Sequence, residues 1–211
     1  FVDCPEGYYG DAPCCKMDKG LSAMWKDHPD FDWYIYQDDD MYIRTQYMDH
    51  FLSGLDRNEC IVLTSHKPMD LGYNSNCTKD DPNFRYPWGQ PILYSSAGLK
   101  KVVKGLEMGA VRKQCGEYQV THDVGNAIVH WMHSMPEVRL PEIWDHPRAR
   151  TKYDATILGT HAISRPHETS LAEVYEIFKD MEFPKPPYQY SFFNTTGFLQ
   201  TQTFQLYGSP T

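Results

Sequence analysis

The sequence has no apolar run long enough to cross a membrane and shows no signal peptide. It also has fewer basic than acidic side chains, 20 Lys and Arg against 28 Asp and Glu, so its formal net charge is −8. This balance argues against a general nucleic-acid-binding protein, which would present a basic face. An anionic substrate would need local help from a metal ion or from a few well-placed Arg and Lys side chains.

Internal repeats, low-complexity tracts and zinc-type cysteine spacings are also missing. Two Asn-x-Thr sequons begin at Asn76 and Asn194 and could accept N-glycans. The number of cysteines is even, which allows several disulfide connectivities. Sequons and cysteines together favour the lumen of the secretory pathway over the cytosol. The six cysteines are Cys4, Cys14, Cys15, Cys60, Cys77 and Cys115.

The length of 211 residues falls within the range of one domain, and 41% hydrophobic residues are enough for a core. We therefore expect residues 1–211 to form a single domain. The first residue is Phe1 rather than Met, so we expect a mature domain, a trimmed chain or a fragment.

One stretch combines an apolar run with three consecutive carboxylates. Residues 33–36 are typical of a strand covered on both faces, which we expect to be central. Asp38, Asp39 and Asp40 then follow its carboxyl end, where open α/β sheets place their ligands. Adjacent carboxylates repel one another, and a hard divalent cation such as Mg²⁺ or Mn²⁺ removes that repulsion. The stretch indicates a metal site, although an acidic turn is the alternative.

The rest of the chain alternates between expected helices and strands, which indicates an α/β fold with a mixed sheet. Residues 116–122 are expected to be an extended connection, 135–160 irregular, and the segment from 183 onward without periodicity. Further strands are expected at residues 59–65, 91–95 and 155–158. Helices are expected over residues 14–28 and 44–54, from Ser96 to Met108, from an N-cap at Asp123 to Met132, and after a cap at Thr169 or Ser170.

A long loop over residues 66–91 contains four aromatic residues, which argue against plain disorder. Their rings could stack on sugars or simply cover the core. These residues are Tyr73, Phe84, Tyr86 and Trp88.

Several segments, in this order, resemble those of the fringe-like β-1,3-glycosyltransferases, a group that includes fringe and the core 1 β-1,3-galactosyltransferases. The resemblance spans residues 4–180. The spacing of Cys4 and Cys15 matches a disulfide pair of fringe, which implies that these two cysteines are joined. The matching segments are Cys4 with Cys14-Cys15-Lys16-Met17, Trp33 to Tyr42, His122-Asp123-Val124-Gly125 (the acidic-Asp-Val helix opening of the family), Ala162-Ile163-Ser164 with His167, and Glu173 to Phe178.

The resemblance implies a GT-A-like, Rossmann-type mixed sheet flanked by helices, a UDP-sugar donor and Mn²⁺. Asp40 would bind the metal directly and His167 would complete the protein ligands. Asp38 and Asp39 would face the ribose, the uracil side or metal-bound water, and Asp38 is also a candidate ligand. His146 is the second candidate among the histidines. His130 and His133, by contrast, are interpreted as local packing.

The implied activity is transfer of a hexose or N-acetylhexosamine, with inversion, to a glycan or glycoprotein hydroxyl in β-1,3 linkage. Asp123 would be the base that deprotonates the acceptor hydroxyl. At the amino end of a helix, the helix dipole would stabilise the Asp123 anion by about 0.3–1 kcal/mol, and a base must be ionised. Asp123 could also be simply the N-cap of that helix, and the two roles are compatible. Relatives are usually type II Golgi proteins, which implies a Golgi location and a membrane anchor upstream.

Two features depart from the family. Its glycine-rich turn corresponds here to residues 88–95, where Trp88 and Gly89 are assigned to the donor site but Gln90 and Pro91 add bulk and remove a backbone donor. The family's catalytic domain opens with strands and an arginine-containing segment that bind the nucleotide, and nothing before Phe1 supplies them. We therefore expect either a C-terminal portion of a longer catalytic domain or a trimmed nucleotide site.

Two alternatives therefore stay open beside the transferase. One is a metal-dependent hydrolase that holds a water between Asp38, Asp40 and the histidines. The other is an inactive, transferase-like carbohydrate-binding module that is stabilised by disulfides and uses its aromatic loop.

Overall fold

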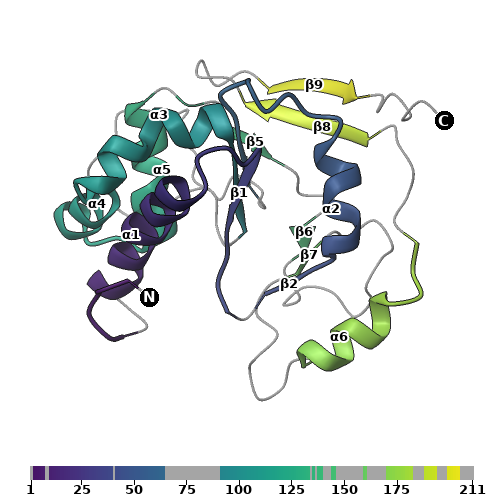
Figure 1. Ribbon diagram of the computed structural model, residues 1–211, viewed down its shortest axis with the longest axis horizontal. Coiled ribbons are helices and arrows are strands. Elements are labelled where there is room, and N and C mark those ends of the chain that lie inside the picture. The colour runs from purple at the N-terminus through teal and green to yellow at the C-terminus, as the bar shows by residue number, and fades with distance from the viewer. Residues whose placement is uncertain are drawn as a thin grey trace.

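Figure 1 shows the computed structural model of the chain, in which a mixed sheet lies between helices. The structure describes residues 2–7, 10–39, 41–64, 91–133, 135, 137–139, 144–145, 159–160, 170–182, 188–193 and 199–204, and the structural statements below concern these residues. The predicted α/β class with a mixed sheet is confirmed.

The larger sheet has its strands in the order β1 (Trp33–Tyr36), β4 (Ile92–Ser95), β3 (Val62–Thr64), β5 (Glu137–Arg139), β8 (Tyr188–Phe193) and β9 (Leu199–Phe204). β3 and β5 are parallel, and the other neighbours are antiparallel. β1 is a strand as predicted, but it ends the order of the described strands instead of being central. Its apolar residues reflect layers packed on both faces, which an end strand can share with a central one.

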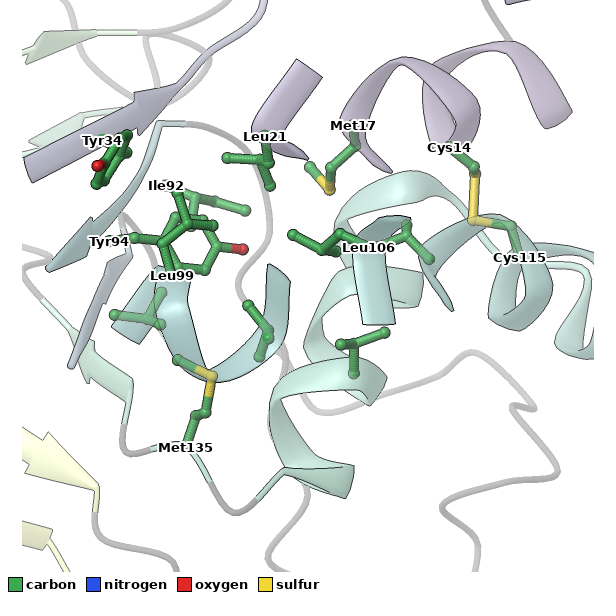
Figure 2. Close-up of a cluster of buried hydrophobic side chains, with 14 residues drawn as sticks. Cys14, Met17, Leu21, Tyr34, Ile92, Tyr94, Leu99, Leu106, Cys115 and Met135 are labelled. Atoms are coloured by element: carbon green, nitrogen blue, oxygen red, sulfur yellow. A yellow bond between two sulfur atoms is a disulfide. The ribbon is translucent and has the colours of Figure 1, made fainter. Parts of the chain in front are cut away.

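Side chains alternate between the two faces of the sheet, as the pleat requires. On β1, Tyr34 packs into the core beneath one group of helices, whereas Trp33 and Ile35 pack against α2 (Thr45–Leu52) on the other face. β4 divides in the same way, with Tyr94 on the first face and Leu93 on the second. The first group of helices comprises α1 (Asp11–Asp27), α3 (Ser96–Glu107), α4 (Ala110–Tyr118) and α5 (His122–Met132) (Figures 1 and 2).

Helix α4 corrects the prediction of an extended connection over residues 116–122. Gly109 adopts φ 76°, which lets the chain reverse between α3 and α4. The amino end of α4 is capped from another helix, because the Asp18 carboxylate accepts the N–H groups of Val111 at 3.0 Å and Arg112 at 2.8 Å. A cap that lies so far away in sequence leaves no local signal.

The carboxyl-terminal region is also more regular than predicted. β8 and β9 pair over six residues each, from Tyr188 opposite Phe204 to Phe193 opposite Leu199. Within residues 135–160, β5 and the two-residue strands β6 (Trp144–Asp145) and β7 (Gly159–Thr160) replace the expected irregular chain. The strand expected at 155–158 lies outside the described residues.

The amino end of α6 and the carboxyl end of α3 can be compared with the helices predicted from the sequence. Ser170 caps α6 (Leu171–Phe178) through a complete capping box with Glu173, as predicted. Helix α3 buries the expected stripe, but its last expected member, Met108, is 82% exposed because the helix ends one residue earlier.

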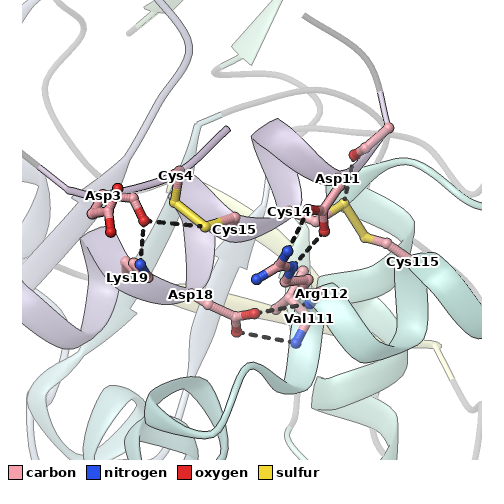
Figure 3. A network of polar contacts seen from close by, with 11 residues as sticks. Asp3, Cys4, Asp11, Cys14, Cys15, Asp18, Lys19, Val111, Arg112 and Cys115 are labelled. Carbon is pink, nitrogen blue, oxygen red and sulfur yellow. Dashed lines mark hydrogen bonds and ion pairs between the residues drawn. A yellow bond between two sulfur atoms is a disulfide. The ribbon is translucent and has the colours of Figure 1, made fainter. Parts of the chain in front are cut away.

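Two disulfides fasten α1 (Figure 3). Cys4–Cys15 confirms the pairing that the family resemblance implied. Cys14–Cys115 was not predicted; it joins α1 to α4 across 101 residues, with the two Cα atoms 6.6 Å apart. Cys60 is the free cysteine of the described part, and Cys77 lies outside it.

No helix in the described ranges has both the length and the apolar character needed to span a membrane.

Gly125 allows α5 to approach α4 closely. A Cβ atom there would lie 2.7 Å from Cys115 Sγ and 3.2 Å from the carbonyl oxygen of Val111. We expect Gly125→Ala to lower the free energy of unfolding by about 1–3 kcal/mol in denaturant titrations. Gly116→Ala in α4 is the control: its Cβ would meet nothing within 4 Å, and a gain of about 0.5–1 kcal/mol is expected. Equal effects at the two sites would contradict the close-packing account.

Asp18 makes stability depend on pH. Burial raises the pKa of this carboxyl from 3.8 to about 6, against the opposing effect of the N–H groups of Arg112 and Val111. The folded protein therefore holds the proton more tightly, so this contribution to stability is complete below the unfolded pKa and is lost as the pH rises through about 6. Asp18→Asn should flatten the fall in the free energy of unfolding across that window, whereas Asp27→Asn, on the exposed end of α1, should retain it.

Candidate functional site

The acidic triad follows β1 as predicted. Asp38 is partly buried and Asp39 is exposed at the carboxyl end of this strand, while Asp40 lies outside the described residues. The chain then continues directly into β2 (Tyr42–Ile43). The triad therefore links the large sheet to a second, smaller one.

The small sheet has the strand order β2-β7-β6. β2 and β7 are antiparallel, with Tyr42 opposite Thr160, and β6 and β7 are parallel, with Asp145 opposite Thr160. The first residue of β2 and the last residues of β7 and β6 therefore lie side by side at one end of the sheet.

All three segments that contain the strongest predicted metal ligands are attached to that end. Asp40 precedes the start of β2 by two residues, and His146 directly follows the end of β6. His167 lies in the segment between β7 and α6. His146 and His167 themselves lie outside the described residues.

Helix α6 is fastened to the same small sheet. Arg44, fully buried directly after β2, places its guanidinium carbon 4.6 Å from the Tyr47 ring centroid and 4.9 Å from that of Phe178. It donates to the carbonyl oxygen of Met181, which also accepts the Tyr47 hydroxyl at 3.2 Å. Tyr42 stacks on Phe178 with the ring centroids 5.9 Å apart. β7, which precedes the segment that contains His167, and the carboxyl end of α6, which follows that segment, are thus both packed on β2 or on the residues just after it.

Asp123, the predicted base, is 7% exposed. It lies in the first turn of α5, one residue after the helix begins, so it is not the N-cap that the sequence predicted. Its Oδ1 accepts the Thr121 hydroxyl and, at 2.9 Å, the Val124 N–H. The first turn still places this side chain at the positive end of the helix dipole.

His122 connects the two predicted carboxylate positions. Its Nε2 lies 3.6 Å from Asp38 Oδ1, with the side chains 17% and 30% exposed. The Tyr36 ring lies beside the imidazole, with the centroids 6.3 Å apart. Burial lowers the pKa of His122, but the neighbouring Asp38 and the charge of Asp123 outweigh it and leave the pKa above 6.5. Burial and the charge of Asp38 together raise the pKa of Tyr36.

A buried polar group sets the orientation of α5. The Tyr94 hydroxyl lies 2.8 Å from His130 Nε2 and 2.7 Å from Asn126 Nδ2, so β4 is hydrogen-bonded to one face of the helix. His130 is therefore a packing residue, as predicted, while His133 is exposed just past the helix end. These bonds fix the rotation of α5 and hence the direction of side chains in its first turn.

The structure thus brings Asp38 next to the helix turn that holds Asp123. Trp88 and Gly89 lie outside the described residues, along with the remaining predicted ligands. Two residues that the sequence did not single out are central to the arrangement. His122 had one available signal, its place directly before the predicted base. Arg44 had none, because its acceptor at Met181 is 137 residues away.

No group of three His, Cys, Asp or Glu side chains in the described ranges is arranged to hold a metal. The candidate donors are carboxylates and imidazoles, a set that suits Mn²⁺.

Arg44 should be sensitive to a change that keeps its charge. Arg44→Lys removes the planar group between two rings and should lower the free energy of unfolding by about 1–3 kcal/mol. Arg57→Lys is the matched control, because Arg57 forms a half-exposed ion pair with Asp32, and it should change stability by less than about 0.5 kcal/mol. Equal losses in thermal unfolding would contradict the anchoring role of Arg44.

No protein-family model matches the chain, and no curated protein is significantly similar to it in sequence.

Proposed function

We propose that this protein is a metal-dependent inverting β-1,3-glycosyltransferase that moves a hexose or N-acetylhexosamine from a UDP-sugar to a glycan or glycoprotein hydroxyl. One observation carries the proposal. The first residue of β2 lies beside the last residues of β6 and β7 at one end of the small sheet, and in the sequence these three strand ends adjoin Asp40, His146 and the segment with His167. At the same time His122 brings Asp38 next to the turn that holds Asp123.

A GT-A-like fold is part of the proposal. Its support is a mixed sheet with helices on both faces and an acidic triad at the carboxyl end of β1. The outer edge of β1 carries no partner strand among the described residues.

Asp40, His167 and His146 would hold the divalent cation, with Asp38 as a further candidate. Asp38 and Asp39 would otherwise face the nucleotide, and Trp88 with Gly89 would lie toward the donor. When bound, Mn²⁺ supplies stabilisation for the negative charge that develops on the leaving diphosphate. The contact between Asp38 and His122 favours the nucleotide-facing role for Asp38, because its Oδ1 already faces an imidazole.

Asp123 would accept the proton of the acceptor hydroxyl as that oxygen attacks the sugar. The Val124 N–H and the Thr121 hydroxyl both donate to Oδ1, and they hold the carboxylate in one orientation. Because little water surrounds a nearly buried carboxylate, its electrostatic interaction with an acceptor hydroxyl that reaches it is stronger than in water.

A location in the secretory pathway, in the Golgi lumen, completes the proposal. Cys4–Cys15 and Cys14–Cys115 support an oxidising compartment, where such bonds persist. If the protein is of type II, a membrane anchor lies upstream.

Titration calorimetry of the full-length protein with UDP, with and without Mn²⁺, tests the proposal. We expect binding that requires Mn²⁺ and that Asp40→Ala abolishes. Asp30→Ala, an exposed carboxylate before β1, should leave binding unchanged. Asp123→Asn should preserve UDP binding but stop transfer, since an amide cannot take up the proton.

Absence of Mn²⁺-dependent UDP binding would remove the transferase proposal. Binding of glycans without UDP would instead support the carbohydrate-binding module. Unchanged transfer in Asp123→Asn would exclude this residue as the base while leaving the donor site intact.

A further inference from the structure

His122 occupies a special place between the two parts of the proposed site. Asp38 follows a strand of the large sheet, and Asp123 lies in the first turn of a helix on one face of that sheet. His122 belongs to the helix but lies 3.6 Å from the carboxylate that follows the strand. Within the described residues its Nε2 is buried and makes no hydrogen bond, so the Asp38 carboxylate is the polar group that it faces.

The neighbours of His122 leave it little freedom. The Tyr36 ring lies beside the imidazole at a tilt of 58°. The rotation of α5 is fixed by the bonds of Tyr94 to Asn126 and His130, one and two turns further along the helix. The imidazole is therefore held in place from both sides and can in turn hold Asp38.

We propose that His122 is a positioning residue that keeps the Asp38 side chain against the amino end of α5. It thereby sets the separation between the carboxylate on the donor side and the base on the acceptor side. This inference rests on the proposed function, which assigns Asp38 to the donor side and Asp123 to the acceptor side. It gives His122 no contact with a reacting atom.

A double-mutant cycle between His122 and Asp38 tests the inference. The variants are His122→Leu, Asp38→Asn and the pair together, titrated with UDP in the presence of Mn²⁺. We expect His122→Leu to weaken UDP binding about tenfold, as the loss of partners around a metal site commonly does. In the Asp38→Asn background the same change should have no further effect, because the group that His122 holds has already been neutralised.

Two more variants separate positioning from packing. His122→Gln retains an N–H group toward Asp38 and should recover most of the affinity, to within about threefold of the wild type. His133→Leu makes the same substitution at an exposed histidine just past the end of α5 and should bind UDP like the wild type. If His122→Leu binds UDP like the wild type, or loses affinity equally in both backgrounds, the positioning role is wrong.

The same variants are compared by thermal unfolding without ligand, so that the inference does not depend on UDP binding. If the wild type fails to bind UDP, the proposed function is wrong, but the contact can still be judged. A shift in the unfolding midpoint on His122→Leu that disappears in the Asp38→Asn background supports the contact. A shift of the same size in both backgrounds overturns it.

Discussion

Two residue pairs between β2 and β7 hold the candidate site together. Tyr42 opposite Thr160 and Ile43 opposite Gly159 join segments that are more than a hundred residues apart. So short a ladder has little stability of its own. The buried guanidinium of Arg44 adds stability that the short backbone ladder does not supply, because it joins the end of α6 to the residues that follow β2. β7, the middle strand, pairs with β6 on its other side, so the small sheet is joined to the chain after β1 through these two pairs.

Features whose determinants lie within a few residues were predictable from the sequence. The capping box at Ser170 needs only Glu173, and four consecutive apolar residues indicate strand β1. Features with distant partners were not predictable. Helix α4 owes its start to a carboxylate on α1, so its last turn was predicted as part of an extended connection.

In the candidate site, too, the sequence identified individual residues but not the contacts between distant ones. Asp38, Asp39 and Asp123 were identified as separate motifs, and the structure brings Asp38 next to the helix turn that contains Asp123. The sequence could not show that His122 mediates this approach. It places His122 beside Asp123, but it gives no sign that the Asp38 carboxylate lies near the same imidazole in the folded protein. It could not show either that Gly125, in the same motif, is needed for packing against Cys115 rather than for chemistry.

The neighbouring cysteines at positions 14 and 15 have a consequence for the order in which the chain matures. Cys15 pairs across 11 residues and Cys14 across 101, so loop closure costs the second bond about 2 kcal/mol more. During synthesis Cys4 meets both thiols before Cys115 exists, and by loop length alone it distinguishes them by less than about 0.1 kcal/mol. A bond from Cys4 to the wrong neighbour has to be exchanged before α1 can be fastened to α4. Chains that form the wrong bond therefore need a thiol-exchange step before the helical layer is complete, and a disulfide isomerase would accelerate that step.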